Sequence, residues 1–81
     1  MDFKTFYLGL TSEKRDEFAD AASTSRGYCN QVAYAGKKIE LGMADVFVAK
    51  SGGALTLDAL PLTDRAMQQR AARSQPSQEV A

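Results

Sequence analysis

The feature that most constrains the fold is a very short link between two helical patterns. Residues 16–36 read DEFADAASTSRGYCNQVAYAG, and only STS, residues 23–25, separates the alanine-rich pattern before it from the pattern after it. A link this short cannot form a flexible loop, so we expect a tight turn whose hydroxyls cap the second helix. The two helices must then cross closely, which requires small residues at the crossing.

The second of these helices, residues 25–35, divides into two faces. Its inward positions are small and apolar: Cys29, Val32 and Ala33. Its other face is mostly polar: Arg26, Gly27, Asn30, Gln31 and Tyr34. Gly36 suits the C-terminal end of the helix, and Lys37 and Lys38 follow it directly.

Three further segments have helical spacing, over residues 3–10, 12–22 and 40–50. Asp2 is the expected N-cap of the first, and Thr11 or Ser12 of the second. The expected apolar positions are Phe3, Phe6, Tyr7, Leu10, Phe18, Ala19, Ala22, Leu41, Ala44, Phe47 and Val48. The sequence therefore predicts an all-α fold of four to five short helices.

The segment ALTLDALPL, residues 54–62, has two interpretations. Thr56 can cap a single helical turn over residues 57–60, whereas the alternation of Leu55 and Leu57 fits a short strand. We favour the helical turn. After residue 63 we expect a frayed helix to about residue 73 and then a flexible tail, so the chain divides into a domain over residues 1–63 and a C-terminal segment over residues 64–81.

Composition excludes several classes of function. The chain of 81 residues has no histidine and one cysteine, Cys29, so a zinc site, a Cys-His or Ser-His catalytic pair and an internal disulfide are not expected. The start, MDFKTFYLGL, does not resemble a signal peptide, and no apolar run is long enough to span a membrane. The sequence therefore predicts a cytoplasmic protein that is not an enzyme and needs no cofactor or metal.

The charge distribution is uneven although the net charge is zero. Residues 1–23 hold three basic and five acidic side chains, residues 24–50 hold four basic and two acidic, and residues 51–81 hold three of each. The basic part of the chain therefore contains the polar helix. A local basic surface can attract phosphate on a neutral protein.

Two short helices, a tight turn and a polar second helix describe a helix-turn-helix. The second helix would enter the major groove of DNA, where Arg pairs with guanine and Asn or Gln with adenine. Helix N–H groups, nearby hydroxyls and the following lysines would contact phosphates. The candidate DNA-binding residues are Thr24, Ser25, Arg26, Gly27, Tyr28, Asn30, Gln31, Tyr34, Lys37 and Lys38. Tyr28 could instead pack its ring on the helix over residues 12–22 with its hydroxyl in solvent, and Tyr34 has the same two interpretations. The two lysines could serve only to cap the helix dipole.

From about residue 8 to residue 62 the chain resembles the prophage Cro/cI-type regulators, especially the small YdaS-like proteins. The resemblance covers LTSEKRDEFADAASTSRGYCNQVA, the lysine pair, residues 40–50, Gly52-Gly53 and residues 54–60. It implies a lambda-repressor-like helical fold that binds DNA and regulates transcription at a phage or prophage operator. Ser23 stands where many members carry Gly, Ile39 where they often carry Pro, and Glu40 where they often carry Ser.

The leading hypothesis is therefore a Cro-like repressor of the bacterial cytoplasm, associated with the nucleoid when bound, that binds a double-stranded operator as a homodimer. One recognition helix buries too little surface for tight binding, so proteins of this kind usually bind as dimers to two half-sites about one helical turn of DNA apart. Residues 55–62 or the segment after them are the candidate dimer surface. The alternative hypothesis is an antitoxin or another module that binds a co-encoded protein with the same fold.

Overall fold

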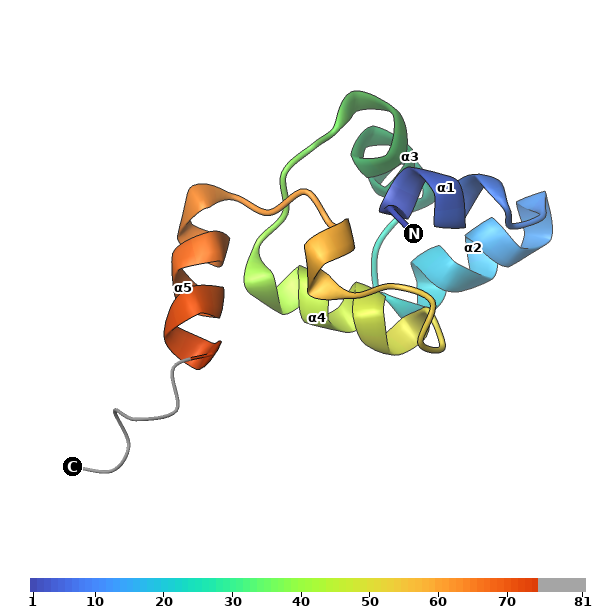
Figure 1. The fold of residues 1–81 in the computed structure, drawn as a ribbon. Helices are drawn as coiled ribbons and strands as arrows, with labels where there is room; N and C mark the ends of the chain where they lie inside the picture. Colours follow the sequence, from blue (N-terminus) through green and yellow to red (C-terminus); the bar gives the residue numbers. More distant parts are fainter. Residues whose placement is uncertain (75–81) are drawn as a thin grey trace.

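Five α-helices and one short 3-10 helix make up residues 1–74, the part of the chain that the computed structural model describes (Figure 1). The elements are α1 (Phe3–Leu8), α2 (Ser12–Ala21), α3 (Arg26–Ala35), α4 (Leu41–Lys50), η1 (Leu57–Ala59) and α5 (Asp64–Ser74). No strand occurs among these residues, which confirms the expected all-α class. None of the helices within them has the length and apolar content needed to cross a bilayer.

Side chains cap the first three helices as the sequence predicts. The Asp2 carboxylate and the hydroxyls of Thr11 and Ser25 accept hydrogen bonds from backbone N–H groups of the first turns, at 2.8, 3.2 and 3.0 Å. These bonds satisfy N–H groups that have no partner inside the helix. Glu40, at the start of α4, makes no such side-chain bond.

α1 is shorter than its apolar spacing predicts. The helix ends at Leu8, and the N–H of Gly9 bonds the carbonyls of Thr5 and Phe6 at 3.2 Å each. Leu10 lies beyond the helix and is only partly buried against the core. The expected end at residue 10 is therefore wrong, because the chain turns at Gly9 toward α2.

Aromatic rings from α1, α2 and α4 form the centre of the core. The ring centroids of Phe3 and Phe47 are 5.1 Å apart, those of Phe18 and Phe47 5.2 Å, and those of Phe3 and Tyr7 5.5 Å. Spacings of this size are typical of packed aromatic pairs. Most expected core positions are buried: Phe3, Tyr7, Phe18, Ala19, Ala22, Cys29, Val32, Ala33, Leu41, Ala44 and Phe47. Phe6 and Val48 are only partly buried.

Backbone hydrogen bonds close the link between α2 and α3. The N–H of Ser23 donates to the carbonyl of Asp20 at 3.0 Å, and the N–H of Thr24 donates to the carbonyl of Ala19 at 2.9 Å. This pair of bonds is a Schellman motif, and it holds Ser23 in the left-handed region with a φ of 57°. Only glycine adopts this conformation without a steric cost, so the serine strains the turn.

Two extended segments meet beside α4. Ile39 and Leu62 are both buried and form an isolated parallel bridge. The N–H of Ile39 donates to the carbonyl of Pro61 at 2.7 Å, and the N–H of Thr63 donates to the carbonyl of Ile39 at 3.0 Å. The bridge therefore holds the segment just before α4 next to the segment just before α5.

The segment between α4 and α5 adopts the helical alternative. Residues Leu57–Ala59 form η1, and the strand interpretation of Leu55 and Leu57 is wrong within the described residues. Leu55 and Leu60 are buried, so the short helix is held by its flanking leucines. The cap expected from Thr56 is also wrong, because that side chain makes no capping hydrogen bond.

α5 packs on α4 although its sequence contains few large apolar side chains. Ala66 is fully buried, Arg73 lies 3.0 Å from Asp45 of α4, and Arg70 pairs with Asp58 of η1. Figure 1 shows α5 at one end of the domain, away from α1 and α2. The predicted helix is present, and the flexible tail expected beyond it lies outside the described residues.

The strained turn generates a prediction for Ser23→Gly. A left-handed L-residue costs about 1–2 kcal/mol, and glycine loses about 0.5–1 kcal/mol more in backbone entropy on folding, so the substitution should raise the free energy of unfolding by roughly 0.5–1 kcal/mol. Urea denaturation measures this difference. Ser23→Ala is the matched control and should show no gain, because alanine retains the steric cost. A glycine variant less stable than the parent would contradict the prediction.

Candidate nucleic-acid interface

α3 is attached to the domain by one face. Cys29, Val32 and Ala33 are buried, and the helix contacts α1 and α2. The burial raises the pKa of the Cys29 thiol, because a thiolate would lose its hydration there. Cys29 is therefore a small core residue, as the sequence predicts, and not an exposed reactive thiol.

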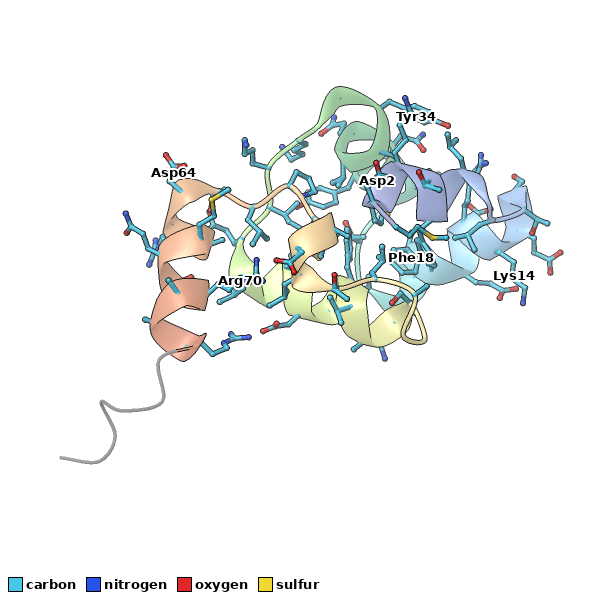
Figure 2. All side chains as sticks on the ribbon, viewed as in Figure 1. Asp2, Lys14, Phe18, Tyr34, Asp64 and Arg70 are labelled. Carbon is cyan, nitrogen blue, oxygen red and sulfur yellow. The ribbon has the colours of Figure 1, made fainter. Side chains whose placement is uncertain are left out.

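The opposite face of α3 is open to solvent. Gly27, Asn30 and Gln31 are exposed, and Tyr34 is 56% exposed. Figure 2 shows Tyr34 on the outer side of α3, on the far side of the domain from α4. The sequence therefore predicts the exposure of this face correctly, while its contact with DNA stays a prediction.

The fold itself does not require glycine at position 27. A Cβ atom built there would meet only the Ser25 hydroxyl oxygen, at 3.8 Å, which is ordinary van der Waals contact. The position lies in the first turn of α3 and is exposed. The absence of a side chain leaves the backbone of this turn accessible to a ligand.

Arg26 is directed at α2. Its guanidinium Nη1 lies 2.9 Å from Asp16 Oδ1, and it donates to the carbonyl and hydroxyl oxygens of Ser12 at 3.3 and 3.2 Å. The bond to Asp16 raises the pKa of Arg26 further, so the side chain stays charged. The sequence predicts Arg26 on the open face of α3 for base contact. In the structure its side chain instead extends from α3 to Ser12 and Asp16 of α2.

Asn30 is tied to α1. The hydroxyl of Tyr7 donates to Asn30 Oδ1 at 2.7 Å, across 23 residues of sequence. Tyr7 is fully buried, and burial raises the pKa of its hydroxyl. Sequence reasoning treated Tyr7 only as a core ring, because helical spacing identifies a buried position and carries no signal about a hydroxyl reaching a distant helix.

The ring of Tyr28 packs on α4, whereas the packing alternative expected it on α2. Tyr28 is half-buried, its ring lies edge-on to Phe47 at 6.5 Å, and the ammonium of Lys37 lies 5.7 Å from its centroid. Burial raises the pKa of the Tyr28 hydroxyl, so the phenol is neutral near pH 7. Lys37 therefore lies over a neutral aromatic surface beside the C-terminal end of α3.

Hydroxyl and ammonium groups flank α3 at its two ends. Thr24 is half-buried and Ser25 is exposed at the N-terminal end, where the Ser25 oxygen already caps the helix. Lys37 and Lys38 are exposed just past Gly36, which ends the helix with a φ of 66°. Seven of the ten predicted residues are therefore exposed on α3 or beside its ends: Ser25, Gly27, Asn30, Gln31, Tyr34, Lys37 and Lys38.

The acidic side chains of α2 are partly neutralised by pairing. Asp16 pairs with Arg26 at 2.9 Å, and Glu17 pairs with Lys14 at 3.3 Å. The Lys14–Glu17 pair is largely exposed, so it adds little to stability, whereas the Arg26 side chain is only 35% exposed. Each pair reduces the negative potential of α2, and Lys37 and Lys38 add positive charge at the C-terminal end of α3.

Comparison of the chain with models of protein families, with curated proteins and with solved structures found no match. Within residues 1–74, no group of three or more His, Cys, Asp or Glu side chains is arranged to hold a metal ion. A proposal of function therefore depends on the geometry of α3 and its neighbours.

The ion pair across α2 and α3 generates a prediction for Arg26→Ala. Loss of the bonds to Asp16 and Ser12 should lower the Tm, because these bonds join the two helices. Gln31→Ala, on the open face of the same helix, is the matched control and should leave the Tm unchanged. Thermal unfolding followed by circular dichroism measures both.

The Asp16→Ala variant completes this experiment. If the ion pair is the cause, the double variant Asp16→Ala, Arg26→Ala should lose less stability than the sum of the two single losses. Equal Tm values for Arg26→Ala and Gln31→Ala would show that Arg26 does not hold the helices together.

Proposed function

We propose that this protein is a sequence-specific DNA-binding transcriptional regulator of the Cro-like repressor type. In this proposal α2 and α3 form a lambda-repressor-like helix-turn-helix, and α3 lies in the major groove of an operator. The observation that carries the proposal is the solvent-exposed polar face of α3, which follows a closed turn and ends beside two exposed lysines.

The geometry of the helix pair supports this interpretation. Two short helices joined by a Schellman turn, with small residues between them, leave one side of the second helix free to project from the domain. The major groove is about 12 Å wide and accepts one α-helix. α3 spans ten residues, so it is about 15 Å long at 1.5 Å per residue. A helix of that length can reach several consecutive base pairs.

Side chains on this face have the chemistry of base readout. The Gln31 amide is exposed and can pair with adenine through a donor and an acceptor. Tyr34 can contact a thymine methyl group or a phosphate with its exposed ring and hydroxyl. Gly27 would allow the first turn of α3 to approach the base edges closely.

The flanking groups fit contacts with the phosphate backbone. Lys37 and Lys38 lie just beyond the C-terminal end of α3, and Thr24 and Ser25 lie at its N-terminal end. Pairing of Asp16 with Arg26 reduces repulsion between α2 and DNA. A protein of zero net charge can therefore present a locally basic surface at α3.

A single α3 buries too little surface for tight specific binding, so we propose that two copies occupy a pseudo-palindromic operator. Half-sites about 10 base pairs apart would place both copies of α3 on one side of the duplex.

Selection of bound sequences from a random DNA pool tests the function. The full chain should enrich a motif with two-fold symmetry, and binding to the selected site should weaken steeply with salt. Uniform, weak binding without enrichment would contradict the proposal. Recovery of a co-encoded protein partner in that case would favour the alternative of an antitoxin-like binding module.

Two substitutions should separate base readout from backbone contact. Gln31→Ala should weaken binding to the selected site by about 1–3 kcal/mol and leave non-specific binding unchanged. Lys38→Ala should weaken binding to all sequences alike and reduce the slope of log K against log salt by about 1. Fluorescence anisotropy titrations at several salt concentrations measure both effects. A change of base preference in Lys38→Ala would show that α3 does not occupy the groove as proposed.

A further inference from the structure

Tyr7 contributes to two parts of the molecule at once. Its ring is packed in the core, stacked on Phe3 at 5.5 Å and covered by the Arg15 guanidinium at 5.1 Å from the centroid. Its hydroxyl reaches the exposed face of α3 and donates to Asn30 Oδ1 at 2.7 Å. A buried side chain therefore controls a polar group on the candidate interface.

The direction of the Tyr7–Asn30 hydrogen bond follows from the neighbouring cation. The positive charge of Arg26, whose guanidinium Asp16 holds at 2.9 Å, acts on the Tyr7 hydroxyl. A cation attracts the oxygen of a hydroxyl and repels its proton, so this charge favours donation of the Tyr7 proton to Asn30 Oδ1, at 2.7 Å. An amide oxygen can accept this proton, whereas an amide nitrogen cannot. The arrangement therefore favours one of the two orientations of the Asn30 amide.

This orientation changes what Asn30 can offer to a base. Reading adenine requires an amide oxygen for N6 and an amide nitrogen for N7 together. Here Oδ1 is turned toward α1 and is engaged by Tyr7, so the exposed Asn30 presents its Nδ2 donors. Guanine offers two acceptors, N7 and O6, on its major-groove edge, whereas adenine places a donor beside N7.

We propose that Tyr7 is a specificity-positioning residue, which orients the Asn30 amide so that Asn30 selects guanine over adenine in the major groove. This inference rests on the proposed function of α3 as the DNA-reading helix. It assigns different roles to the two neighbouring amides: Asn30 is oriented by α1, and Gln31 keeps both its donor and its acceptor available for adenine.

The test compares Tyr7→Phe with the parent protein on DNA sites selected by the parent. Phenylalanine retains the packed ring and removes only the hydroxyl. The base pair that Asn30 contacts is identified first. It is the position of the DNA site at which the Asn30→Ala protein no longer prefers one base over the others. The ratio of affinities for guanine and adenine is then measured at that position for each protein. This ratio does not depend on the fraction of protein that is folded, so a loss of stability alone cannot change it.

The parent should prefer guanine at this position by about tenfold, a typical size for one specific contact. Tyr7→Phe should reduce or reverse that preference while the salt dependence of binding stays the same. In the double variant Tyr7→Phe, Asn30→Ala, loss of the hydroxyl should have no further effect on base preference.

An unchanged guanine preference in Tyr7→Phe would overturn the inference while leaving the proposed function intact. A parent preference for adenine at this position would overturn it as well. If the parent protein selected no motif at all, both the proposed function and this inference would fall.

Discussion

The left-handed turn at Ser23 is the constraint on which the arrangement of α2 and α3 depends. Its two backbone hydrogen bonds end α2 a few residues before α3 begins, so the two helices lie in contact, with Ala22 and Cys29 both buried. Arg26 can reach Asp16 only because the turn brings the first residue of α3 beside α2. The buried and exposed faces of α3 both follow from this single change of direction.

α1 adds a second constraint, which acts through Tyr7. The aromatic core holds the ring, and the hydroxyl holds Asn30 on the exposed face of α3. The polar face is therefore only partly free in solution, because Arg26 and Asn30 have partners within the protein while Gln31 and Tyr34 project into solvent. Side chains that are already oriented in the free protein lose less conformational entropy when a ligand binds, which strengthens specific binding.

Features encoded by neighbouring residues were predictable. The caps at Asp2, Thr11 and Ser25 depend on a side chain and a backbone N–H three residues later, so they appear in the sequence as local patterns. The bridge between Ile39 and Leu62 was not predictable, because it joins residues far apart in the chain and no local pattern identifies the partner of either. The end of α1 at Leu8 was not predicted either, because the packing of the following segment sets where a helix ends.

The sequence by itself determined where helices form and which face of each is buried, because apolar spacing and capping chemistry act within a few residues. It also determined that Gly27, Asn30, Gln31 and Tyr34 lie on the open face of α3. Only the tertiary structure decided which polar side chains of α3 are engaged within the protein: Arg26 by α2, and Asn30 by α1. The physical reason is that hydrogen bonds between helices depend on crossing geometry, which no local pattern of residues describes.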